Sequence, residues 1–175
     1  TIITAGVLRR GTGASLGSGG LVINGGQFDL NGGSITLTTL SGSGGTLALG
    51  SGTVTVNASG TLAADITGTG SLVKAGTGIL TLSGNNTFSG GITIAGGTVS
   101  FASSTASGTG PIMTTGSVID YANGVSIANP IIVNSNTTQL QVLSGATATQ
   151  AGVISQAGGA RPLEKIGSGT LILAA

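Results

Sequence analysis

Short bursts of alternating apolar residues, separated by glycine, run along the whole chain. The clearest are LVI (21–23), FDL (28–30) and ITL (35–37), and their first residues lie 7 positions apart. The same step separates 47–49 from 54–56 and 92–94 from 99–101. Alternation places both apolar side chains of a burst on one face of a strand. Glycine supplies the positive φ that tight corners need. The pattern therefore predicts short strands joined by tight corners, with almost no helix.

Three consecutive bursts span about 21 residues, the length of one coil of a three-faced parallel β-helix. Coils of this kind stack so that inward side chains form continuous ladders. A seven-residue period also occurs in coiled coils, but here the apolar pairs are i and i+2, and glycine and β-branched residues dominate. We therefore predict an all-β, single-stranded parallel solenoid of about eight coils. No linker interrupts the pattern, so residues 1–175 are interpreted as one continuous β-helical domain.

A longer repeat is superimposed on the coils. LVKAGTGILTL (72–82) returns as LEKIGSGTLIL (163–173), with an offset of 91 residues, which predicts a duplicated block of about four coils. A lysine near glycines also raises the possibility of a phosphate loop, but no Gly-x4-Gly-Lys-Ser/Thr string is present and a strand follows the glycines. We expect Lys74 to be an outward charge between inward Leu72 and the turn, where it discourages lateral sheet pairing.

Composition narrows the function classes. The chain has 35 glycines, 5% charged residues, 39% hydrophobic residues and a net charge of +1. That apolar content argues against disorder, and the near-neutral charge offers no basic field for nucleic acid. The absence of cysteine suits a protein that crosses a bacterial envelope unfolded. The chain starts at Thr1 and ends mid-pattern in LILAA, so we expect a piece of a longer protein whose open strand edges favour end-to-end self-association or fraying.

The residues that carry chemistry are sparse. Histidine and cysteine are absent, which excludes Ser-His-Asp and Cys-His catalysis and the usual zinc sites within this segment. We predict no catalytic, cofactor-binding or metal-binding residue, no cofactor and no enzymatic activity. The acids are Asp29, Asp65, Asp120 and Glu164. Two of them converging within about 10 Å on one face would favour the alternative, a β-helical polysaccharide-binding or -cleaving domain.

Residues 68–101, GTGSLVKAGTGILTLSGNNTFSGGITIAGGTVSF, resemble the passenger-associated transport repeat of bacterial autotransporters. The family pattern is Leu-x-Lys-x-Gly-x-Gly-x-Leu-x-Leu-x-Gly, followed by an Asn-containing loop and Gly-Gly. A second, truncated copy is predicted at about 154–175, where Arg161-Pro162 and Glu164 depart from the usual lead-in. The structural motif residues are Leu72, Lys74, Gly76, Gly78, Leu80, Leu82, Gly84, Asn86, Gly90 and Gly91 in the first copy, and Leu163, Lys165, Gly167, Gly169, Leu171 and Leu173 in the second.

The resemblance implies a right-handed parallel β-helix that forms the structural or stalk segment of a secreted, adhesin-type passenger. It implies type V secretion through the outer-membrane β-barrel of the full-length protein, folding at the cell surface and display of an adhesive region. The expected location is the bacterial cell surface or outer membrane, or the medium after secretion. The expected partner is a host or neighbouring-cell surface, protein or glycan, reached through the wider passenger in cell adhesion and virulence, with no nucleic acid involved.

Overall fold

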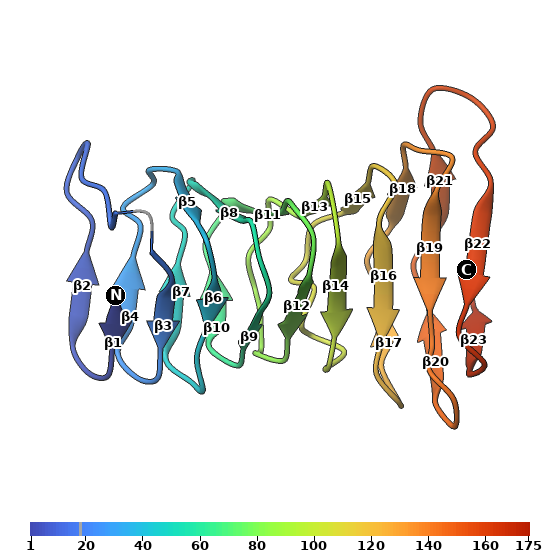
Figure 1. Cartoon of the computed structure of the whole chain (residues 1–175), viewed down its shortest axis with the longest axis horizontal. Coiled ribbons are helices and arrows are strands. Elements are labelled where there is room, and N and C mark those ends of the chain that lie inside the picture. The colour runs from blue at the N-terminus through green and yellow to red at the C-terminus, as the bar shows by residue number, and fades with distance from the viewer. Residues whose placement is uncertain (18) are drawn as a thin grey trace.

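The computed structural model describes residues 1–17 and 19–175 as an elongated parallel β-solenoid of about nine turns (Figure 1). The described residues form short strands without any helix, and every ladder between them is parallel. The predicted right-handed parallel β-helix is confirmed. Some turns are shorter than the sequence predicted, because Ser71 pairs with Thr53, only 18 positions earlier. No helix that could span a membrane occurs in the described chain.

Each complete turn passes over three faces. Face one combines two sheets that the Gly42–Leu62 bridge connects. Its strands in order are β1 (Ile2–Ile3), β3 (Leu21–Ile23), β6 (Leu40–Ser41), β9 (Gly60–Leu62), β12 (Ile79–Leu82), β14 (Thr98–Phe101), β16 (Val118–Tyr121), β19 (Thr138–Gln141) and β22 (Leu163–Ile166).

Face two is divided into two sheets by a gap of two turns, at residues 84–90 and 103–109, where the chain forms no strand. The strands before the gap are β2 (Val7–Arg9), β4 (Gln27–Asp29), β7 (Thr46–Ala48) and β10 (Asp65–Thr67). The strands after it are β17 (Ser126–Ile127), β20 (Thr147–Gln150) and β23 (Thr170–Leu173).

Face three is one continuous sheet. Its strands are β5 (Ile35–Leu37), β8 (Thr53–Val56), β11 (Ser71–Lys74), β13 (Ile92–Ile94), β15 (Ile112–Thr114), β18 (Ile131–Val133) and β21 (Ile154–Gln156).

The core is the narrow space enclosed by the three faces. Alternation within each strand directs every second side chain inward, and parallel registration stacks like positions on one another. Leu72, for example, lies between Val54 and Ile92, and all three are buried. Each fully buried side chain of this size contributes about 1.5–3 kcal/mol. The solenoid is therefore stabilised by apolar ladders that run from turn to turn.

The turns become longer toward the C-terminus. Glu164 pairs with Gln139, 25 positions earlier, whereas the early turn that brings Ser71 onto Thr53 advances by 18 positions. The additional residues form loops at the corners, such as the projecting loop between β21 and β22 (Figure 1). Strand ladders thus tolerate variable corners as long as the inward positions remain in register.

Candidate functional site

The first copy of the repeated segment contains a lysine whose side chain lies inside the solenoid. Lys74 is fully buried, and its register partners Val56 and Ile94 are buried as well. The expectation of an outward charge is therefore wrong. The physical reason is parity, because Lys74 follows Leu72 by two residues and so shares its inward face.

The ammonium group of Lys74 is held by the corner that follows its own strand. Nζ donates to the carbonyl oxygen of Ala75 at 2.5 Å and to that of Gly76 at 3.1 Å. Neither carbonyl accepts a backbone hydrogen bond in the described part of the chain. Burial lowers the pKa of Lys74, since removing the ammonium from water disfavours its charged form. The lysine thus pairs two otherwise unsatisfied carbonyls at the expense of desolvating a charge.

Glycine is required at this corner for two reasons. Gly76 has a φ of 62°, in the left-handed region that β-carbon-bearing residues avoid. A β-carbon there would also collide with the carbonyl oxygen of Asn57 on the preceding turn. The Lys-x-Gly spacing of the repeat is therefore explained by one corner geometry: a lysine that points inward and a glycine that allows the next turn to approach.

Asn86 replaces the missing strand at the gap in face two. Its Oδ1 accepts from the backbone N–H of Ile66 on the preceding turn at 2.8 Å, and its Nδ2 donates to the carbonyl of Ala106 on the following turn at 2.6 Å. The side chain is buried, and Phe88 two residues later is buried too. A side-chain amide therefore continues, across the gap, the hydrogen bonding that a peptide group provides elsewhere. The sequence identified Asn86 as a motif residue but gave no sign of this bridging role.

The second copy reproduces the lysine corner in a different place. Lys165 Nζ donates to Ile166 O at 2.7 Å and to Gly167 O at 2.9 Å. Its register partner is Leu140 on face one, whereas Lys74 belongs to face three. The offset between the copies is four full turns and one further face, which agrees with the predicted block of about four coils and places the second copy on another face. Lys165 is exposed, unlike Lys74.

The remaining motif residues differ in burial between the copies. Leu72, Leu80 and Leu82 are buried, whereas Leu163 and Leu173 are exposed and Leu171 is half-buried. A β-carbon would meet backbone of a neighbouring turn at Gly84, Gly90, Gly91, Gly167 and Gly169, and a serine side chain at Gly78. These contacts explain the choice of glycine, while a role of the motif residues in transport remains a prediction.

A second group of buried polar residues was not identified from the sequence. Asn129 Nδ2 donates to Gly110 O at 2.6 Å and to Gly108 O at 3.1 Å, and its Oδ1 accepts from Ser107 Oγ at 2.6 Å. Gln150 Nε2 donates in turn to Asn129 O at 2.9 Å. These amides lie at corners where the sequence shows only isolated polar residues, so no local signal distinguished them from exposed ones.

The four carboxylates are bonded separately to their neighbours. Asp65 Oδ1 accepts from the backbone N–H of Asn85 at 2.7 Å. Asp120 Oδ2 accepts from Ser100 Oγ at 2.6 Å, and Glu164 Oε2 accepts from Gln139 Nε2 at 2.7 Å. No two acids are register partners. Within the described residues, no group of three potential metal-ligating side chains occurs either.

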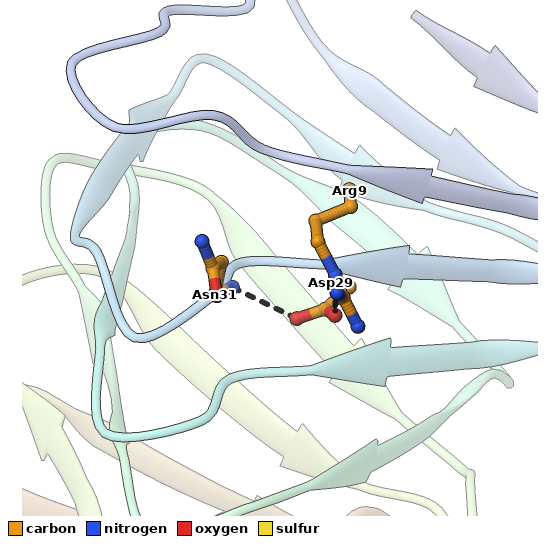
Figure 2. Close-up of polar contacts among 3 residues, drawn as sticks. All are labelled: Arg9, Asp29 and Asn31. Carbon is orange, nitrogen blue, oxygen red and sulfur yellow. Dashed lines mark hydrogen bonds and ion pairs between the residues drawn. The ribbon is translucent and has the colours of Figure 1, made fainter.

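Asp29 forms the salt bridge shown in Figure 2. Its Oδ2 accepts from Arg9 Nε at 2.7 Å, and its Oδ1 accepts from the backbone N–H of Asn31 at 2.8 Å. The hydrogen bond from Asn31 and then the contact with Arg9 lower the pKa of Asp29. Asn31 itself has a φ of 52°, so the carboxylate stabilises a corner in the left-handed conformation. This arrangement indicates a structural role for Asp29 on the outer surface.

Comparison with known proteins supports the interpretation of the two lysine-containing segments as copies of one repeat. The family model described as passenger-associated-transport-repeat matches residues 72–101 and 163–175. No curated protein and no solved structure matches the chain. The two matched segments begin at Leu72 and Leu163, the residues that open the two lysine corners. These two matches support an autotransporter passenger with β-helical repeats.

Proposed function

We propose that this chain is a structural segment of the passenger that promotes its own translocation and folding at the cell surface. The observation that carries the proposal is the match of both lysine corners to the passenger-associated-transport-repeat. In the first copy, Leu72 and Asn86 act inside the stack, where they contact both neighbouring turns. Their chemistry is that of turn-to-turn adhesion, which suits a segment that has to fold progressively as it emerges.

Stepwise folding follows from the ladder geometry. Strand β11 pairs with β8 on one side and β13 on the other, so each completed turn presents an edge to the next turn. Each added turn buries further apolar side chains, and the resulting free energy opposes return of the chain. A passenger that leaves an outer-membrane β-barrel from one end would thus be drawn outward by its own folding.

The finished rod would hold an adhesive region of the wider passenger away from the cell. Its location would be the bacterial surface, or the medium after secretion, and its partner a host or neighbouring-cell surface. The polysaccharide-cleaving alternative gains no support, because each carboxylate is bonded to its own neighbours and none pairs with another.

The test is a display assay. The chain is inserted between a secretion signal and the β-barrel of an autotransporter, and surface exposure is measured by added protease. We expect Asn86→Ala, in the repeat, to lower display severalfold. The matched control is a substitution in the first turns, such as Leu30→Ala, selected to give the same loss of folding stability. Equal display of the two variants would contradict a transport role specific to the repeat.

A further inference from the structure

The corners at Lys74 and Lys165 have the same local structure but differ in burial. In both, one ammonium group donates to the carbonyls of the next two residues, at 2.5 and 3.1 Å for Lys74 and at 2.7 and 2.9 Å for Lys165. Lys74 is covered by the following turn through β13, whereas Lys165 lies uncovered on the last described turn. The bonds therefore do not depend on the following turn.

The lysine bonds differ in range from the other interior polar bonds. Lys74 reaches acceptors one and two residues away, so its ring closes with little loss of chain entropy. Asn86 instead bonds to residues 20 positions away in each direction and requires both neighbouring turns. The two residues of one repeat thus depend on different amounts of completed structure.

The ammonium group is well suited to an early, solvent-accessible step. It has three donors, enough to satisfy two carbonyls while a further N–H remains free for water. At the second corner, Ile166 O also accepts from the backbone N–H of Val142 at 3.3 Å, so the closed corner is tied to the preceding turn. A corner closed in this way presents a fixed edge on which the next turn can form.

We infer that Lys74 and Lys165 are corner latches that set the order of folding: each lysine closes its own corner first, and the next turn buries the closed corner second. The biological use of this order rests on the proposed transport function, but the order itself is a property of the chain. The repeat would then work on whichever face it occurs, as the positions of Lys74 on face three and Lys165 on face one require.

The main test is the folding kinetics of the whole chain. In Lys74→Met the side chain retains its length and loses its donors. We expect refolding from urea to slow about tenfold with little change in the unfolding rate, because a contact already made in the transition state acts on the folding rate. Asn86→Ala is the matched variant, and we expect it mainly to accelerate unfolding. An unchanged refolding rate in Lys74→Met would overturn the inference.

A second measurement does not require a variant altered in the centre of the stack. Lys165→Met affects only the last described turn, where Gly169 N–H donates to Val142 O at 3.0 Å. We expect the Gly169 amide to exchange with solvent about tenfold faster in this variant, and to be unaffected in the neighbouring control Glu164→Gln. Unchanged exchange in Lys165→Met would contradict latching. Slow refolding of Lys74→Met together with normal surface display would support the corner latch and contradict the proposed transport role.

Discussion

The part of the solenoid before residue 70 and the part after it have different interiors. Among the described residues of 1–70, every buried side chain is apolar. Beyond residue 70 the interior contains eight buried polar or charged residues. These are Lys74, Asn86, Ser107, Thr114, Ser117, Asn129, Thr138 and Gln150.

The difference teaches how a solenoid keeps its register. Apolar ladders stabilise the early turns, where face two is continuous. The later turns include the gap in face two, and the last of them are the longest. Hydrogen bonds are directional, whereas apolar contacts tolerate displacement, so buried amides fix positions that strand pairing no longer fixes. Asn86, which bonds to both turns beside the gap, is therefore best understood as a replacement for missing ladder bonds.

The largest expected effect is a cavity in the apolar region. Phe28 on β4 is fully buried, and Phe28→Ala should reduce the free energy of unfolding by about 3–5 kcal/mol. Urea denaturation followed by circular dichroism provides the measurement. A loss below about 1 kcal/mol would show that the early turns repack freely and that their ladders are not tightly packed.

Loss of a buried side-chain amide should lower the free energy of unfolding slightly less than the cavity at Phe28. The described residues of 1–70 contain no buried side-chain amide. Asn129→Ala leaves Ser107 Oγ and the carbonyls of Gly108 and Gly110 without their partner, at a cost of about 2–4 kcal/mol. The control Asn134→Ala, at an exposed position, should change stability by no more than about 0.5 kcal/mol. Equal effects in chemical denaturation would remove the distinction between the two regions.

The buried lysine should make the stability of the later turns depend on alkaline pH. Because the folded-state pKa of Lys74 is lowered, the unfolded chain binds more protons between that pKa and 10.5, so stability rises with pH there. Tyr121 acts oppositely, since burial raises its pKa and stability falls once the unfolded tyrosine ionises near 10.0. We expect wild-type stability minus that of Lys74→Met to rise with pH until the pH reaches 10.5, the pKa of an unfolded lysine. A flat difference would show that burial does not perturb Lys74.

The smallest effect concerns the surface of the first turns. Arg9 is 68% exposed and Asp29 14% exposed, so a double-mutant cycle with Arg9→Gln and Asp29→Asn should give a coupling of about 0.2–1 kcal/mol. Because the pKa of Asp29 is lowered, its contribution is present above 3.8 and disappears as pH falls through the folded-state pKa. A coupling well above this range would mean that the early turns also depend on a polar contact.

Local pattern predicted much of the strand structure. The bursts at 21–23 and 35–37 are β3 and β5, and the burst at 28–30 overlaps β4. The same alternation places Lys74 inside with Leu72, whereas the charge of Lys74 predicts exposure, and the alternation is the stronger signal. The gap at 84–90 was not predicted, because irregular backbone bonds and an asparagine side chain, all to residues about 20 positions away, replace a strand ladder there.

The sequence by itself determined the three-faced parallel solenoid, since period-two alternation and glycine corners act over a few residues. It also determined the lysine corner, whose donor and acceptors lie within three consecutive residues. Only the tertiary structure decided that the two copies occupy different faces, because the face depends on the summed lengths of all intervening turns. It likewise decided that Lys74 is buried and Lys165 exposed, because an inward side chain is buried only where the next turn covers it.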